Sequence, residues 1–118
     1  MNSHRVNIIS LLQLIERKHE QDEYQNEVPY VGVATEMCCQ WFDDFYHPHF
    51  SEFISAFSEE ELQEFEKFND IFEKHVKSLP ETLPELWLNQ GWLEISAYAA
   101  SIIKKFNWQD LRPKYDPE

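Results

Sequence analysis

Hydrophobic residues recur at helical spacing through nearly the whole chain, and strand-like alternation of β-branched residues is almost absent. Residues 3–20 predict a first helix. Its inner stripe consists of four large aliphatic residues: Ile8, Leu11, Leu12 and Ile15. Residues 21–28 are polar and acidic, and they predict a connecting loop. The pattern therefore favours an all-α protein.

A second helix is predicted over residues 30–46, with Pro29 in its first turn. Apolar side chains cover so much of this helix that we expect a central, well-buried position. The sequence His47-Pro48-His49 ends the helix, because proline cannot continue the hydrogen-bond ladder. A short helix over residues 50–57 is expected to follow.

The clearest local signal is Ser58-Glu59-Glu60-Glu61, which predicts a capping box at the start of a helix over residues 58–79. In such a box Ser58 caps the helix, and Glu61 reaches back to the backbone of Ser58. The spacing also predicts two supporting ion pairs four residues apart on this helix, Asp70 with Lys74 and Glu73 with Lys77. The helix ends at Leu79-Pro80.

Two further helical segments complete the pattern. A short turn over residues 82–88 has Thr82 and Glu85 in capping-box positions, and Asn89-Gln90-Gly91 separates it from a last helix over residues 92–106. The tail over residues 107–118 is polar, and Trp108, Leu111 and Tyr115 are expected to hold part of it down. At 118 residues the chain predicts one domain, a compact bundle of four principal helices with one or two short ones.

Charge is distributed unevenly along the chain. There are 22 acidic residues against 10 lysines and arginines, and not one lysine or arginine occurs between His19 and Glu66. That segment, which we call the base-free segment, carries 13 acids: Glu20, Asp22, Glu23, Glu27, Glu36, Asp43, Asp44, Glu52, Glu59, Glu60, Glu61, Glu64 and Glu66. A surface of one sign repels nucleic acid and anionic lipid and attracts basic partners over long range. We therefore expect a basic protein partner, and neither nucleic acid nor a membrane.

The two cysteines, Cys38 and Cys39, are adjacent, which predicts reduced thiols and a cytoplasmic protein. They lie on the helix that the pattern buries, with no basic residue near them, so we expect unreactive core cysteines. No apolar run is long enough to cross a membrane, and no small-residue cleavage site follows the N-terminus.

One cluster has the chemistry of metal ligands or of general acids and bases: Asp43, Asp44, His47 and His49. The imidazoles lie in a turn and no helical metal-binding motif supplies further ligands, so we expect neither a metal nor another cofactor. Glycine-rich phosphate loops and nucleophile elbows are absent from the sequence.

Aromatic and acidic residues alternate around the His-Pro-His turn. The aromatic residues are Phe42, Phe45, Tyr46 and Phe50. Such an arrangement fits an interface hot spot with a charged rim. The alternative is that these rings pack the short helix 50–57 onto the helix before it.

In size, acidity and aromatic-acid composition, the chain resembles the small immunity proteins that bacteria pair with toxin nucleases in contact-dependent growth inhibition systems. The resemblance implies a non-catalytic protein that neutralises a basic toxin by covering its cleft with acids and aromatic anchors. The candidate contacts are Asp43, Asp44, Tyr46, His47, Glu52, Glu59, Glu60 and Glu64. Two alternatives stay open: a small enzyme using the cluster at residues 43–49, and an acidic adaptor for another basic protein.

Overall fold

The computed structural model describes residues 1–115, and that part of the chain is all-helical with no strand, as predicted. The α-helices are α1 (Ser3–Glu16), α2 (Lys18–Glu27), α3 (Val33–Cys39), α4 (Ser51–Ser55), α5 (Glu59–His75), α6 (Leu83–Leu88) and α7 (Gln90–Lys105). A π-helical segment η1 (Gln40–Phe45) continues α3, and a 3₁₀ turn η2 (Val76–Ser78) continues α5. None of these helices is both long and apolar enough to cross a bilayer.

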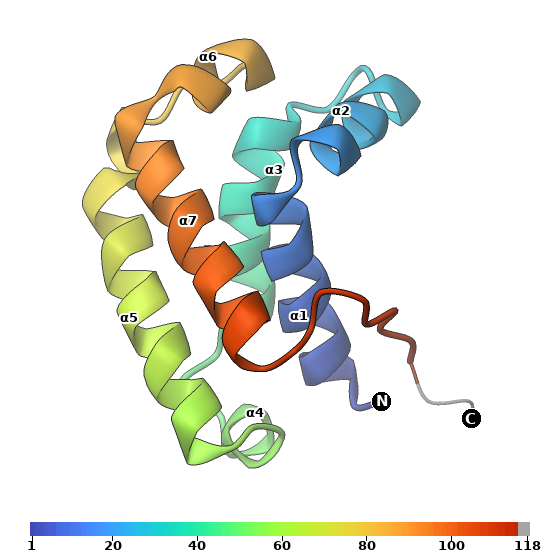
Figure 1. The fold of residues 1–118 in the computed structure, drawn as a ribbon, viewed down its shortest axis with the longest axis vertical. Helices are drawn as coiled ribbons and strands as arrows, with labels where there is room; N and C mark the ends of the chain where they lie inside the picture. The colour runs from blue at the N-terminus through green and yellow to red at the C-terminus, as the bar shows by residue number, and fades with distance from the viewer. Residues whose placement is uncertain (116–118) are drawn as a thin grey trace.

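Helices α1, α5 and α7 and the continuous segment of α3 and η1 form a bundle, with α2 and α6 at one end and α4 at the other (Figure 1). Helix α7 packs against both α1 and α5. The core between the helices is rich in aromatic rings, and its largest fully buried members are Trp41, Trp92, Phe53, Phe65, Phe68 and Phe72. Burial of this apolar surface is the main driving force for assembly of the bundle.

The predicted loop at residues 21–28 is wrong, because α2 is helical there after a break at Arg17. The side chain of Gln21 in this helix is fully buried. Its amide donates to the carbonyls of Leu14 (2.8 Å) and Ile15 (3.0 Å), the last turn of α1. The indole of Trp87 donates to the Gln21 carbonyl at 2.7 Å. One buried amide side chain therefore ties this polar helix to α1 and α6.

The second principal helix starts at Val33 rather than at residue 30, and Pro29 lies in the preceding turn. The side chain of Gln25 holds this turn by donating to the carbonyls of Val28 and Val31 and accepting from the Val33 N–H at 3.1 Å. The helix ends before Pro48 as predicted, but its last part is the π-helical segment η1.

Helix α5 begins with the predicted capping box: Ser58 Oγ accepts from the Glu61 N–H at 3.1 Å, and Glu61 accepts from the Ser58 N–H at 2.8 Å. The α-helical part ends at His75, before the predicted end at residue 79. The two predicted lysine pairs do not form, since neither Asp70 nor Glu73 makes an ion pair within residues 1–115. Their carboxylates are therefore without a compensating cation.

At Thr82 the predicted capping box is wrong. Its hydroxyl donates to the Glu85 carboxylate at 3.1 Å instead of accepting a backbone N–H. Helix α7 begins at Gln90, two residues before the predicted start, because Asn89 caps it by accepting from the Trp92 N–H at 3.0 Å. Gly91 lies in that first turn. A Cβ at this position would lie 2.8 Å from Cγ of His75, so the close approach of His75 requires glycine.

The tail after α7 turns back along α1 (Figure 1). Trp108 is buried, and Gln13 holds the tail by donating to the carbonyls of Trp108 and Leu111, both at 2.9 Å. The Tyr115 hydroxyl donates to Asn7 at 2.7 Å, although the tyrosine ring is mostly exposed. The predicted tail extends to residue 118, and residues 116–118 lie outside the described part of the chain.

Candidate functional site

The structure places the predicted contact residues in three environments. Asp43 and Asp44 are exposed on η1, and Tyr46 and His47 follow where η1 ends. Glu52 is exposed in the first turn of α4. The remaining three predicted contacts lie in the N-terminal half of α5: Glu59, Glu60 and Glu64.

Tyr46 is a fixed part of the core boundary. Its ring stacks on Trp41 with centroids 4.6 Å apart and meets Phe53 edge-on at 5.7 Å. Trp41 is itself fully buried and donates its indole N–H to Asn69 on α5 at 3.0 Å. Tyr46 therefore joins η1 to α4, and Trp41 joins η1 to α5. Of the two interpretations of the aromatic cluster, packing holds for Tyr46.

The hydroxyl end of Tyr46 faces acids. Burial, followed by the charges of Glu66, Asp70 and Glu73, raises the pKa of Tyr46 to about 12. Within residues 1–115 this hydroxyl has no hydrogen-bond partner. Ring contacts thus hold the Tyr46 side chain in place, while its hydroxyl has no hydrogen-bond partner in the described chain.

A pocket of about 510 Å³ opens between the His47–His49 turn, α4 and α5. Beside Tyr46 and Asn69 it is lined by Pro48, His49, Ile54, Leu62, Glu66 and Asp70. We call it the Tyr46 pocket. Pro48, Ile54, Leu62 and the Tyr46 ring provide apolar surface, and the two carboxylates lack an ion-pair partner within residues 1–115. A cation with an apolar stem has the chemistry to fit it.

Two of the predicted contacts on α5 pair with cations of the same molecule. Glu64 is buried, and its carboxylate lies 3.5 Å from Lys67 Nζ, 3.9 Å from Lys105 Nζ and 3.4 Å from the Tyr98 hydroxyl. Glu60 is exposed and pairs with the same Lys105 at 3.2 Å. These two carboxylates join α5 to α7, while Glu59 is exposed and has no ion-pair partner in the described chain.

The histidines of the turn differ in their surroundings. His47 stacks on Phe50 with centroids 4.8 Å apart, and its Nε2 lies 2.7 Å from the backbone carbonyl of Asp44. His49 lines the Tyr46 pocket. The structure does not gather Asp43, Asp44, His47 and His49 into one ligand set, and residues 1–115 contain no group of three such side chains placed to hold a metal ion.

The cysteines are half-buried at the end of α3 rather than in the core, contrary to expectation. Burial raises the pKa of Cys38 to about 11. Burial and the charges of Asp43, Glu36 and Asp44 raise the pKa of Cys39. Both thiols are thereby kept protonated at neutral pH, in line with the expected lack of reactivity.

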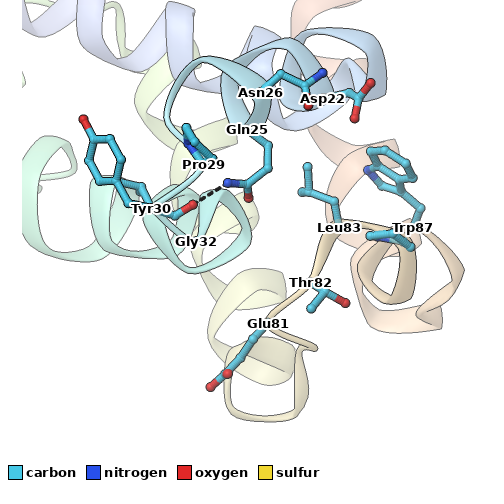
Figure 2. Close-up of a pocket in the computed structure, with 12 residues that line it drawn as sticks. Asp22, Gln25, Asn26, Pro29, Tyr30, Gly32, Glu81, Thr82, Leu83 and Trp87 are labelled. Carbon is cyan, nitrogen blue, oxygen red and sulfur yellow. Dashed lines mark hydrogen bonds between the residues drawn. The ribbon is translucent and has the colours of Figure 1, made fainter.

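A second pocket, of about 520 Å³, lies between α2, the turn before α3, and the start of α6 (Figure 2). Figure 2 shows Asp22 on one rim, Glu81 on the opposite rim and Trp87 along one wall. We call it the α2–α6 pocket. The sequence interpretation missed it, because the helix α2 that forms one wall was expected to be a loop.

Glu66, Asn69 and Asp70 were not among the predicted contacts, although a signal for them exists. Glu66, Asp70 and Glu73 recur at four- and three-residue intervals, which places them on one face of α5. The prediction assigned Asp70 and Glu73 to lysine partners, so this face appeared neutral.

Comparison of the chain with protein-family models, with curated proteins and with solved structures finds no match.

Proposed function

We propose that this protein is an immunity- or antitoxin-type inhibitor that binds a basic protein, with a toxin nuclease as the expected partner. The observation that carries the proposal is a set of acids without an ion-pair partner in the described chain. These acids are Glu36, Asp43, Asp44, Glu52, Glu59, Glu66, Asp70 and Glu73. They contrast with Glu60, Glu61 and Glu64, whose cations come from within the molecule.

The unpaired acids gather around both ends of η1. Glu36, Asp43 and Asp44 surround Cys39, the residue before η1. Glu66, Asp70 and Glu73 surround Tyr46, the residue after it. Uncompensated like charges repel one another, and a basic partner relieves that repulsion on binding. A nuclease cleft is built to hold phosphates, and carboxylates at similar spacing satisfy the same basic side chains.

Of the contacts predicted from the sequence, the proposed contact surface includes Asp43, Asp44, Tyr46, His47, Glu52 and Glu59. It also includes Glu66 and Asp70. Glu60 and Glu64 are assigned to the α5–α7 contact. Phe50 is 59% exposed and lies beside Glu52, so it provides apolar area next to the charges. Large aromatic residues of this kind supply much of the binding energy at interfaces, whereas charges set the rate of association.

The test is recovery of the partner from native lysate with the purified protein, followed by binding kinetics across a salt series. The variant Asp43→Lys with Asp44→Lys is expected to lower the association rate. The control is Glu81→Lys with Asp110→Lys, which changes the net charge equally at two exposed acids outside the base-free segment. Association should slow as salt rises, because the screening length falls to about 10 Å at 0.1 M.

Inhibition of the recovered partner separates an immunity protein from an adaptor. If the partner is a nuclease and loses activity at one equivalent, the inhibitor function stands. A basic partner that keeps its full activity would establish the adaptor alternative. An association rate independent of salt, or equal effects of the two double variants, would reject binding through the acidic surface.

A further inference from the structure

We infer that the Tyr46 pocket receives an arginine side chain of the basic partner, so that the partner inserts its side chain into this protein. The inference rests on the proposed function, and it reverses the expected role of Tyr46. As an anchor, Tyr46 would have to leave its own surroundings and enter the partner. Its stacking on Trp41 at 4.6 Å and its edge contact with Phe53 hold it in place as a wall.

The size and the walls of the pocket suit a single long side chain. Its volume of about 510 Å³ falls within the ~300–1,000 Å³ range typical of ligand pockets. Pro48, Ile54 and Leu62 provide apolar contact for the methylene stem. Ile54 is 43% exposed, so part of this apolar surface is free to be covered.

The polar groups are hydrogen-bond acceptors that match a guanidinium. Glu66 and Asp70 lie one helical turn apart on α5 and both line the pocket. The Tyr46 hydroxyl adds a third oxygen, unpaired within residues 1–115. A guanidinium offers five donors in a flat fork and binds two carboxylates at once, whereas an ammonium is a compact point charge. This geometry favours arginine over lysine.

No cation of the described chain occupies this position. Lys67 follows Glu66 directly, but its Nζ lies 3.5 Å from Glu64, on the α7 side of α5. Lys74 is one turn beyond Asp70 and makes no ion pair with it. The acids that raise the pKa of Tyr46 are thus available to a cation from outside, which would lower that pKa again.

The experiment uses the purified full chain and three small probes, followed by nuclear magnetic resonance. N-acetyl-arginine amide carries the guanidinium, N-acetyl-citrulline amide is its neutral isostere, and N-acetyl-lysine amide carries an ammonium. The reporters are the Trp41 indole N–H and the Asn69 side-chain amide. The indole N–H donates a hydrogen bond to the Asn69 amide oxygen, and Asn69 lines the pocket. We expect the chemical shifts of both reporter groups to change saturably as the arginine probe is added, with a dissociation constant on the order of 10 mM.

The variant Glu66→Gln with Asp70→Asn should weaken binding of the arginine probe about tenfold. The matched control is Asp22→Asn with Glu81→Gln, which removes two carboxylates from the α2–α6 pocket of nearly equal volume and should leave binding unchanged. Equal shifts with citrulline, equal or tighter binding of lysine, or no change in the Glu66/Asp70 variant would each overturn the inference.

The two proposals fail in different ways. If a basic partner is recovered and its binding depends on Asp43 and Asp44 but not on Glu66 and Asp70, the pocket inference is wrong and the inhibitor function stands. If the arginine probe binds in the pocket but no basic protein is recovered, the pocket chemistry stands and the proposed function fails.

Discussion

Helix α5 carries two sets of carboxylates with opposite surroundings. Glu60, Glu61 and Glu64 meet cations from α1 and α7, and Glu61 binds Arg5 through both of its oxygens at 2.8 and 3.1 Å. Glu66, Asp70 and Glu73 lie further along the same helix and meet no cation within residues 1–115. Both sets are spaced for one helical face, so spacing alone does not distinguish them.

The comparison separates acids that build the fold from acids that are available for binding. Arg5 connects α1 to the start of α5, and it also donates to the Ala56 carbonyl at 3.1 Å. Its guanidinium lies 5.3 Å from the centre of the Phe57 ring. The unpaired set makes no such connections; Glu66 and Asp70 line the Tyr46 pocket, and Glu73 contributes to the raised pKa of Tyr46. Removal of a carboxylate should therefore destabilise the fold in the first set and leave it intact in the second.

The largest effect is expected from Glu61→Gln. This change leaves Arg5 without its carboxylate and weakens the capping box, so the free energy of unfolding should fall by about 3 kcal/mol in urea denaturation. Glu59→Gln is the control in the same turn, because Glu59 is exposed and unpaired in the described chain, and it should change stability by less than about 0.5 kcal/mol. Similar losses in both variants would remove the distinction between the two sets.

A smaller effect is expected from the titration of Tyr46. Its pKa is raised in the folded state from 10.0 to about 12, so the unfolded chain loses this proton first as the pH rises. The stabilising contribution is complete below about pH 10 and is lost between about pH 10 and 12. Since Tyr46 is only half-buried, solvent screening reduces the loss to about 1 kcal/mol.

The measurement compares urea midpoints of the wild type and of Tyr46→Phe over this pH range. The wild type should lose more stability than the variant, which has no phenol to ionise. Removing the unpaired acids with Glu66→Gln and Asp70→Asn should narrow the difference, because their charges contribute to the raised pKa of Tyr46. Parallel pH profiles of wild type and Tyr46→Phe would show that the pKa of Tyr46 is not raised in the folded state, and an unchanged difference in the Glu66/Asp70 variant would show that these acids do not act on Tyr46.

The smallest effect is expected from neutralising the unpaired set with Glu66→Gln, Asp70→Asn and Glu73→Gln. Like charges one turn apart on a helix repel each other, so stability at low salt should rise by about 0.2–0.5 kcal/mol. The gain should disappear at high salt, where surface repulsion is screened. Thermal unfolding at two salt concentrations measures it, and a clear loss of stability would mean that these acids support the fold.

The π-helical segment shows where sequence patterns lose their predictive power. The apolar spacing predicted the helix that contains Trp41, and the proline predicted its end. The wider turn over Gln40–Phe45 has no signature of its own in the sequence. In this π-helical segment Trp41 is buried between Tyr46 and Phe68, whose ring centres lie 4.6 and 4.8 Å from that of Trp41. The position of Tyr46, and hence the pocket, follows from this packing.

By itself the sequence determined the helical class, the start of α5 and the excess of negative charge. Each of these depends on residues within a few positions of one another: apolar spacing, the cap formed by Ser58 and Glu61, and the run without lysine or arginine. Only the tertiary structure decided which carboxylates are neutralised, that Gln21 ties α2 to α1 and α6, and that Tyr46 lines a pocket. The partners involved are distant in the chain, as Arg5 and Glu61 are, and an ion pair forms only where packing brings its two charges within reach.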